Sequence, residues 1–524
     1  MSNLKLLFTS SSKLNHKEIK KKKKLRNRII GYPLVAIQII ISIIFLLLLF
    51  HFNFLPDKYM IILIIVLILI SVYNVVSQFT KAHIIGKVLS VTLSVAMLTA
   101  SFYIAKTTDM LDTITNTNTN PNTITVSVIV LSTDPAQNIT DAKNYKFGCQ
   151  STLDKVNTDK AITQINEKVG ATINTTTYSE WKSLVNALNT KEVKAIILNE
   201  AYRSALQESS PEFSSTTKVI DTITIESQNT PKVADKNISV EPFSIYIAGN
   251  DEYGSKISAI GRNDVNIIAT FNPKTKQALL VTTPRDYYIT LDNLAGNTGL
   301  DKLTHAGNFG IEGSIEALQN LYAINIDYYV KVNFTGAAGI VDALGGITVD
   351  SELAFTTCSD TAPIPYKFVV GENECDGQKA LAFCRERQVL ANGDNQRGRD
   401  QMIAIKGIFA KATSPAIITN YLDVLDSVSN MLSTNIPTSA ITAMVKDTLS
   451  NSTTWNIQTY NVTGTGATKQ CQLYGFYADV MIPDYSTVTN AMDLMSKIKK
   501  GEIFNVDQYI SSQKETTTSA TKAQ

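Results

Sequence analysis

The chain has 524 residues, of which 44% are hydrophobic and 18% charged, so its composition argues against a fully disordered chain and allows two or three domains. The formal net charge of +2 indicates no particular partner. The distribution of charge is more informative, because residues 1–28 hold ten Lys or Arg and one acidic residue, Glu18. We interpret 1–28 as a basic cytoplasmic segment beside a membrane, where lysines also suit anionic headgroups.

Three apolar runs follow this basic segment. They cover Ile29–Phe50, Tyr59–Val76 and Val88–Ala105, and each is close to the roughly 20 residues that a helix needs to cross a bilayer. Three such runs in succession argue against a buried globular helix and against a cleaved signal peptide. We therefore predict a three-helix transmembrane anchor over 29–106. Since the basic end stays inside, an odd number of spans places the C-terminal domains of this multi-pass protein outside the cell.

The exported part is expected to begin with a polar tether and a small domain. Residues 107–123 are rich in Thr and Asn and lack apolar periodicity. Residues 124–230 read as an accessory α/β domain, in which we find no metal spacing, nucleophile or phosphate loop. Its predicted strands are Ile124–Leu131 and Val193–Asn199, and its predicted helices are Thr158–Val169 and Tyr178–Leu188.

A polar segment, Asn229–Asn237, separates this domain from a larger one over 238–503. Buried strands are predicted at Phe243–Gly249, Val265–Phe271, Ala278–Pro284 and Tyr328–Phe334. Helices are predicted at Gly313–Leu321, Ala337–Leu344, Gly377–Arg387, Arg397–Ala412, Tyr421–Leu432 and Tyr485–Lys500. The mixture predicts the α/β class, with helices covering a central sheet, before a disordered tail over 504–524.

Charged residues gather where the predicted strands end. Asp251 follows the first strand, and Arg262 and Asp264 begin the second, two residues apart and so on one face. Arg285 and Asp286 follow the third strand. Strand ends are where open α/β sheets bind ligands. Lys302 then precedes a helix expected near Gly310, whose first amides could also accept an anion.

A second group comes from the segment FCRERQVLANGDNQRGRDQ. Asp394 is predicted to cap a helix with Arg397 in its first turn, and Gln401 lies one turn further on the same face. Arg385 and Arg387 would diverge by about 200° on a regular helix, so only one of them should face a shared pocket. We favour Arg387, at the helix end.

These residues suggest a phosphate site with a metal. The basic members are Arg262, Arg285, Lys302, Arg387 and Arg397, and clustered guanidinium groups bind phosphate oxygens in bidentate fashion. Asp251 and Asp264 would add the carboxylates that suit Mg²⁺. Four His and five scattered Cys give no zinc spacing, which argues against a zinc hydrolase.

Simpler interpretations remain open for single residues. One Arg–Asp pair is more often a surface salt bridge than a site, and His305 alone is typical of a structural hydrogen-bonding residue. Cys358 and Cys375 either form a disulfide, which an oxidising compartment permits, or remain free. The prediction of a site depends on several charged pairs lying at element ends together.

With those residues in place, the large domain resembles the LytR-CpsA-Psr family of cell-wall glycopolymer ligases. The matching segments are GRNDVNIIATFNPKT, LLVTTPRDYYI, DKLTHAGNFGIEGSIEALQNL, IDYYVKVNFTGAAGIVDALGGITV and ALAFCRERQVLANGDNQRGRDQ. Three spans and an accessory domain resemble its streptococcal capsule-type members. The resemblance implies an apolar tunnel for a polyprenyl chain, with the phosphate or pyrophosphate on Arg residues and Mg²⁺. It also implies transfer of a teichoic acid or capsular polysaccharide to peptidoglycan.

The resemblance also implies residue roles. Asp251 and Asp264 look like metal ligands, Arg262, Arg285, Arg387 and Arg397 like the pyrophosphate clamp, and Asp394 and Gln401 like its supporting polar shell. One departure is Asn263, where family members commonly have Ser.

The mechanism we expect is phosphoryl transfer. Arg285 and Mg²⁺ would stabilise charge on the phosphoryl oxygens while a sugar hydroxyl of peptidoglycan attacks, and Asp264, or else Asp286, would take its proton. Two alternatives share the pocket: a polyprenyl-pyrophosphate hydrolase, and a non-catalytic lipid-phosphate-binding regulator of capsule or wall synthesis. Nucleic acid is not an expected partner, because the 28-residue basic segment carries no DNA-binding pattern.

Overall fold

The computed structural model describes residues 7–10, 14–53, 55–116, 122–150, 155–203, 206–207, 210–227, 234, 236–250, 257, 260–294, 297–412, 431–450 and 455–513. It forms two compact units, Met1–Asp112 with Thr438–Thr453, and Thr113–Pro437 with Thr454–Gln524. Each unit is described by itself below.

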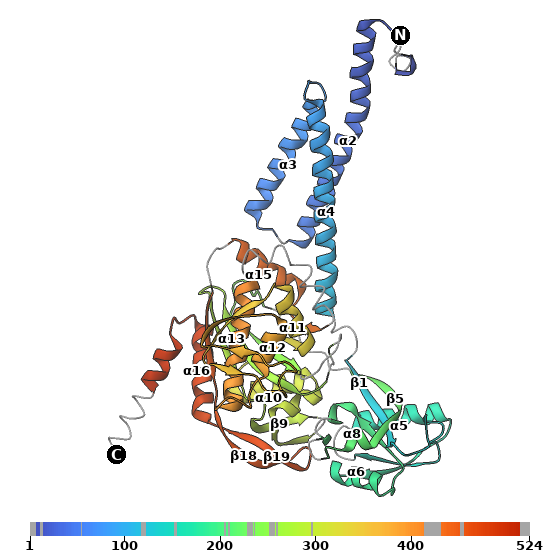
Figure 1. Cartoon of the computed structure of the whole chain (residues 1–524), viewed down its shortest axis with the longest axis vertical. Coiled ribbons are helices and arrows are strands. Elements are labelled where there is room, and N and C mark those ends of the chain that lie inside the picture. Colours follow the sequence, from blue (N-terminus) through green and yellow to red (C-terminus); the bar gives the residue numbers. More distant parts are fainter. Residues whose placement is uncertain are drawn as a thin grey trace. The chain divides into compact units, whose positions relative to one another are not determined.

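The first unit contains the apolar helices. They are α2 (His16–Phe52), α3 (Asp57–Ser77) and α4 (His83–Asn116) (Figure 1). All three are long and apolar enough to cross a membrane, so the predicted anchor of three helices is confirmed. Helix α4 continues to Asn116, through ten residues that we expected to belong to an irregular tether. The side chains of Met110 and Leu111 are buried there, which explains why this Thr-rich stretch is helical.

A fourth helix of this unit comes from the C-terminal half of the chain. Helix α15 (Thr438–Ser450) carries Lys446, whose Nζ donates to Asn53 Oδ1 at 3.0 Å and to Asp57 Oδ1 at 2.9 Å. Both acceptors flank the short connection between α2 and α3. The chain therefore returns to the membrane anchor after most of the large domain is complete.

The second unit begins with a five-stranded sheet in the order β3-β2-β4-β1-β5. Its strands are β1 (Asn122–Leu131), β2 (Lys146–Gln150), β3 (Asn174–Tyr178), β4 (Ala195–Asn199) and β5 (Thr217–Ser227). Helix α5 (Lys155–Val169) packs on one face of this sheet and α6 (Trp181–Asn189) on the other. Tyr178 ends a strand, so the second predicted helix starts three residues later than expected.

The large domain is built on a six-stranded mixed sheet in the order β16-β11-β6-β7-β8-β17. Its strands are β6 (Phe243–Asn250), β7 (Asn263–Asn272), β8 (Gln277–Thr282), β11 (Tyr328–Asn333), β16 (Leu432–Thr434) and β17 (Asn456–Asn461). β6 pairs in parallel with β11 and β8 with β17, whereas the other pairs are antiparallel. This arrangement confirms the predicted α/β class.

Helices cover both faces of the central sheet. On one face, α10 (Ile311–Tyr322) and α16 (Tyr485–Lys500) share a core with Tyr246 and Ala248 of β6. The neighbouring positions of the same strand, Ile245 and Ile247, line a cavity with residues of α11 (Phe334–Ala343), α12 (Gly377–Arg385) and α13 (Gly393–Ala412). Because side chains alternate along a strand, this cavity lies on the opposite face from α10 and α16.

Shorter elements complete the domain. The hairpin β9 (Tyr288–Leu294) and β10 (Asn297–Lys302) leads into α9 (Leu303–Ala306) and the 3-10 helix η3 (Gly307–Phe309). Three further antiparallel pairs are β12 (Ile347–Ser351) with β15 (Gly371–Cys375), β13 (Phe355–Thr356) with β14 (Lys367–Phe368), and β18 (Gly464–Cys471) with β19 (Phe476–Pro483).

Two segments predicted near the C-terminus are not found as predicted in the described residues. Residues 421–430 of one predicted helix lie outside the described residues, and Leu432, at its expected end, begins strand β16. Residues 506–513, which we expected to belong to a disordered tail, are helical, and Val506 is buried in the main core.

Candidate functional site

The most prominent concavity of the described residues is a cavity of about 480 Å³ between the central sheet and helices α11, α12 and α13. Its walls are mainly apolar, with Ile247, Val265 and Val332 from the sheet and Leu381 and Ile405 from the helices. A volume of this size lies in the range of small-molecule sites, and apolar walls suit a hydrocarbon chain.

One end of the cavity is charged. Four arginines line it, together with two aspartates, so the lining carries an excess of two positive charges. The residues are Arg285, Arg385, Arg387 and Arg397, with Asp264 and Asp360. Guanidinium groups that converge in this way bind phosphate oxygens well. The cavity therefore joins an apolar chamber to a positively charged end.

Asp264 and Arg285 form the buried pair at this end. Asp264 lies at the start of β7 and Arg285 follows β8, and Arg285 Nη1 donates to Asp264 Oδ2 at 2.5 Å. Burial alone would raise the pKa of Asp264, but Arg285, Arg397 and Arg262 outweigh it and hold that pKa below its usual range. The carboxylate is thus ionised and remains a possible oxygen ligand for a metal.

Arg397 lies near the start of α13. Its side chain is 8% exposed and forms an ion pair with Asp394, with Nη2 2.8 Å from Oδ1. Burial lowers the pKa of Arg397, and the neighbouring Arg285 adds to this effect. Gly398 permits the close approach, because a Cβ there would lie 3.1 Å from Cγ2 of Thr282 at the end of β8. A larger residue would require Thr282 or Asn461 to shift by a few tenths of an ångström.

Two details of α13 differ from or extend the sequence expectation. Helix α13 begins at Gly393, so Asp394 lies within the first turn and does not cap the helix, although a carboxylate is still favourable there. Gln401 lines the cavity with Arg397, as their spacing predicted, and its amide donates to the carbonyl oxygen of Cys384 at 3.2 Å.

Arg385 and Arg387 both line the cavity, contrary to our expectation that only one of them would. The reason is Glu386, where α12 stops and the backbone becomes extended, with φ −63° and ψ 133°. Its buried carboxylate accepts from the backbone N–H groups of Cys358, Arg387 and Gln388, each at 2.8 Å, and more weakly from Val389. These hydrogen bonds outweigh burial and lower the pKa of Glu386.

Sequence reasoning set Arg385 aside in favour of Arg387 and missed Glu386. The sequence did contain a signal, which is an acid, Glu386, between two basic residues near the expected helix end. A carboxylate that is buried there needs several hydrogen-bond donors, and such donors usually fix a turn. Arg385 is held on the cavity side by its contact with the Phe334 ring, 4.5 Å from the centroid, and by donation to the carbonyl of Thr361.

The remaining predicted residues lie around this end or outside it. Lys302 Nζ contacts Asp286 Oδ1 at 2.9 Å, and Arg285 Nε lies 3.5 Å from Asp286 Oδ2, but neither Lys302 nor Asp286 lines the cavity. Arg262 precedes β7, and its charge acts on Asp264. Asp251 lies outside the described residues. The first turn of α10 carries Glu312 and does not contribute to the cavity, so that helix start offers no anion site here.

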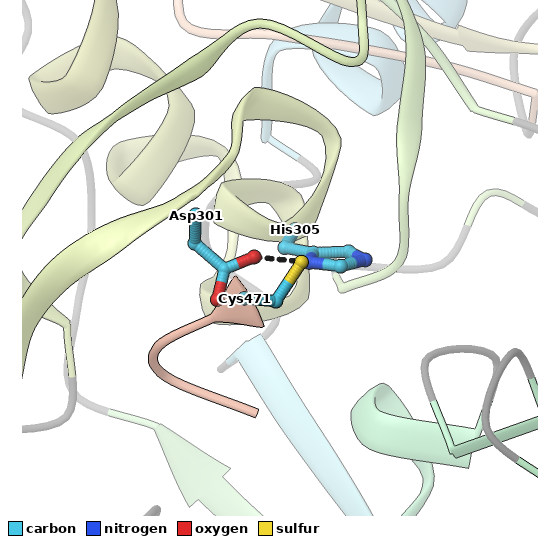
Figure 2. A group of neighbouring side chains, drawn as sticks. All are labelled: Asp301, His305 and Cys471. Atoms are coloured by element: carbon cyan, nitrogen blue, oxygen red, sulfur yellow. Dashed lines mark hydrogen bonds and ion pairs between the residues drawn. The ribbon is translucent and has the colours of Figure 1, made fainter. Parts of the chain in front are cut away.

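Figure 2 shows a second polar cluster, formed by Asp301, His305 and Cys471 in the main core. All three side chains are buried and close enough together to suggest metal ligands. However, His305 Nδ1 is 2.6 Å from Asp301 Oδ1, whereas nitrogen and oxygen on one tetrahedral zinc lie about 3.3 Å apart. Asp301 also accepts from the backbone N–H groups of Lys302 and Leu473. The cluster is a hydrogen-bonded structural network, as expected for His305.

The five cysteines are free. Cys358 and Cys375 do not form the disulfide that the sequence left open. Cys375 is buried at the end of β15, where its thiol donates to the carbonyl oxygen of Asn373 at 3.6 Å. Cys384 lines the cavity, and burial raises its pKa, so it is an inert thiol at neutral pH.

The chain is similar to known proteins over its large domain. Residues 211–492, more than half of the chain, match the LytR_cpsA_psr family. The polyisoprenyl-teichoic acid–peptidoglycan teichoic acid transferase TagU of Enterococcus faecalis is 35% identical over 197 residues, which are 37% of this chain and 62% of that protein. TagU of Bacillus subtilis is 36% identical over 216 residues, 40% of this chain and 66% of that protein.

The matched segment thus spans about three fifths of the first relative's length. Among solved structures, B. subtilis TagV is 26% identical with a TM-score of 0.41, over 50% of this chain and 98% of that one. The family match covers all the residues that line the cavity, including its four arginines. The chain belongs to the LytR_cpsA_psr family.

Proposed function

We propose that this protein transfers a glycopolymer from a polyprenyl pyrophosphate to peptidoglycan, outside the cytoplasmic membrane. The observation that carries the proposal is the cavity, which combines apolar walls with four arginines at one end. A polyprenyl pyrophosphate has the same division into a hydrocarbon chain and an anionic head. The names of the relatives, which describe teichoic acid transferases, support a wall polymer as the cargo.

Orientation is part of the same proposal. Residues 1–28 are strongly basic and precede three helices that are apolar enough to span a membrane. With the basic end inside, the large domain lies on the outer surface of the cell membrane, where peptidoglycan is assembled. We expect the acceptor to be a peptidoglycan sugar hydroxyl and the cargo to be teichoic acid or capsular polysaccharide.

The chain's own groups account for charge stabilisation in this reaction. Arg285 and Arg397 are buried at the charged end and bind the phosphoryl oxygens as negative charge spreads over them. Arg385 and Arg387, at the end of α12, contact the same head group. Polyprenyl phosphate is the leaving group, and its chain remains in the apolar part of the cavity.

Mg²⁺ is a further part of the proposal. Asp264 fits a metal-ligand role, because it is ionised and carries an oxygen donor at the charged end. Asp251, beyond the end of β6, is the second carboxylate that we assign to the metal. Mg²⁺ would supply additional positive charge to the pyrophosphate. The lowered pKa makes Asp264 a weak proton acceptor, which leaves Asp286 as the other predicted base.

The test is a ligation assay with the full chain in lipid nanodiscs. Lipid-linked oligosaccharide, peptidoglycan and Mg²⁺ are supplied, and peptidoglycan-linked polymer is measured against released phosphate. We expect linkage with the wild type, none after addition of EDTA, and none with Arg285→Ala. The matched control is Arg399→Ala, since Arg399 lies on α13 but pairs with Glu352 and does not line the cavity.

The other outcomes of this assay exclude the proposal. Release of phosphate without linkage would identify a hydrolase. Binding of the lipid without any turnover would identify a regulator. Full linkage activity of Arg285→Ala would show that the cavity's charged end is not the reaction site.

A further inference from the structure

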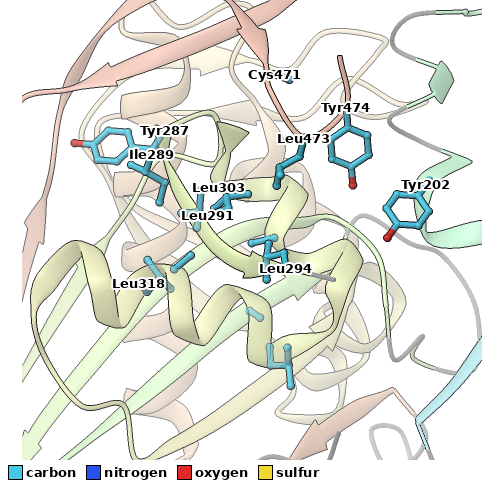
Figure 3. Close-up of a cluster of buried hydrophobic side chains, with 14 of the residues drawn as sticks. Tyr202, Tyr287, Ile289, Leu291, Leu294, Leu303, Leu318, Cys471, Leu473 and Tyr474 are labelled. Atoms are coloured by element: carbon cyan, nitrogen blue, oxygen red, sulfur yellow. The ribbon is translucent and has the colours of Figure 1, made fainter. Parts of the chain in front are cut away.

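Tyr202 joins the accessory sheet to the large domain. It ends the 3-10 helix η2 (Glu200–Tyr202), directly after β4, and its side chain is 2% exposed. Its ring centroid lies 5.2 Å from that of Trp181 in the accessory part, and 5.7 and 5.8 Å from those of Phe309 and Tyr474 in the large domain. Figure 3 shows Tyr202 beside Tyr474 at the edge of the shared core. Ring pairs at these distances are favourable beyond simple burial.

Tyr474 is held from its other side by residues of α9 and η3. The His305 ring lies 4.7 Å from the Tyr474 ring, and Asn308 donates to the Tyr474 hydroxyl at 2.7 Å. His305 is in turn fixed by Asp301, which also accepts from the backbone N–H of Leu473, next to Tyr474. Tyr202 therefore packs against a buried, hydrogen-bonded network and not against a mobile loop.

The same short segment forms part of the charged end of the cavity. The backbone N–H of Thr304 donates to the carbonyl of Arg285 at 2.8 Å, and the Thr304 hydroxyl lies 3.4 Å from Asp264 Oδ1. Thr304 and His305 are adjacent in α9, so one face of this turn contacts Arg285 and Asp264 while the other contacts Tyr474. This short segment therefore contacts both Tyr474 and Arg285.

We propose that the accessory domain is a positioning element for the pyrophosphate site, and that it acts through Tyr202. The inference rests on the proposed function, because it assigns the site a pyrophosphate. Tyr202 is a positioning residue, since it is not among the residues that line the cavity. Its ring sets the position of the α9–η3 segment and so the position of Arg285 relative to the arginines on α12 and α13.

The geometry predicts which ligand depends on this positioning. Arg285 approaches from the strand ends, where Arg397 also acts on Asp264, whereas Arg385 and Arg387 come from the end of α12 on the helical wall. A pyrophosphate has two groups to place between these walls, whereas a monophosphate can be held by one wall. Movement of α9 should therefore weaken pyrophosphate binding more than monophosphate binding.

The experiment measures binding of geranylgeranyl pyrophosphate and geranylgeranyl monophosphate to the full chain in nanodiscs, and compares their Kd ratio. Tyr202→Ala should lower the preference for pyrophosphate at least about fivefold, the smallest usual coupling between distant sites. Tyr202→Phe keeps the ring and should restore the wild-type ratio. A fall in the folded fraction alone weakens both probes equally and leaves the ratio unchanged.

Two further variants control for general damage to the accessory domain and for misfolding of Tyr202→Ala. Ile165→Ala also damages the accessory domain, but in the core on the opposite face of its sheet, and should leave the ratio unchanged. Phe309→Leu removes a ring from the other side of the contact and should act like Tyr202→Ala even if the latter misfolds. A wild type without preference for pyrophosphate would refute the proposed function. A wild type with that preference, and unchanged ratios in Tyr202→Ala and Phe309→Leu, would overturn the positioning role alone.

Discussion

Glu386 is the residue on which the arrangement of Arg385 and Arg387 depends, and Glu386→Gln tests this role with little change in shape. The carboxylate accepts backbone hydrogen bonds from residues 387–389 at Oε1 and from Cys358 at Oε2. The neutral amide of Gln keeps an acceptor oxygen at the position of Oε1 and places a donor NH2 group at the position of Oε2. The N–H of Cys358 would then face an N–H group.

The expected loss in the free energy of unfolding follows from these four hydrogen bonds. Loss of charge assistance costs about 1 kcal/mol for each of the three bonds at Oε1, and an unpaired buried N–H costs about 1–3 kcal/mol more. Relief from burying a charge offsets part of this, so we expect a net loss of about 3 kcal/mol. At roughly 2 °C per kcal/mol for a domain of this size, the unfolding midpoint should fall by about 6 °C.

The stabilisation that Glu386 provides should depend on pH. The folded pKa of Glu386 lies below its ordinary value, so the stabilisation is fully present above about pH 4.3 and is lost as pH falls through the folded pKa. The difference between wild type and Glu386→Gln should therefore be large at pH 7 and smaller at pH 3.5. Thermal unfolding followed by tryptophan fluorescence measures it.

The control is Glu372→Gln, because Glu372 is exposed on β15. That variant should melt as the wild type does at both pH values. If Glu386→Gln also melts as the wild type does at pH 7, then the four donors do not stabilise the turn, and the account of why both arginines face the cavity is wrong.

Two other predictions concern the helix α13. Burial raises the pKa of Asp400 to about 7, so stability should fall as pH rises from about 4 to above 7. Asp400→Asn should remove this loss, of up to about 4 kcal/mol, in urea unfolding at pH 4.5 and 8, and parallel curves for the two proteins would contradict the assignment. Ala404→Phe fills the cavity next to Ile405 and should weaken binding of geranylgeranyl monophosphate roughly tenfold without lowering the unfolding midpoint. Unchanged binding would show that the hydrocarbon chain lies elsewhere.

Much of the fold was predictable because its signals are local. The strands β6, β7, β8 and β11 are mainly apolar runs, and α16 has the bounds that its periodicity predicts. The spans were identified from length and hydropathy alone. Local signals failed at α4, where Met110 and Leu111 extend the helix into a Thr-rich stretch by burying their side chains.

The site was predictable in its residue types but not in its geometry. Arg285, Arg397 and Asp264 converge because their elements end at one edge of the sheet, as their positions suggested. The joint presence of Arg385 and Arg387 depends on the helix ending at Glu386, which is fixed by donors up to 28 residues away in the chain. Periodicity within one segment contains no information about such a contact.

The position of the cavity could not be predicted from the sequence, for a different reason. Ile245 and Ile247 are as apolar as Tyr246 and Ala248, yet the first pair lines the cavity and the second pair packs in the core. A strand that is apolar on both faces predicts burial of both, and only the volume of the covering helices decides whether one face stays open. A hydrocarbon ligand that packs against the apolar walls of this cavity should therefore stabilise the fold as it binds.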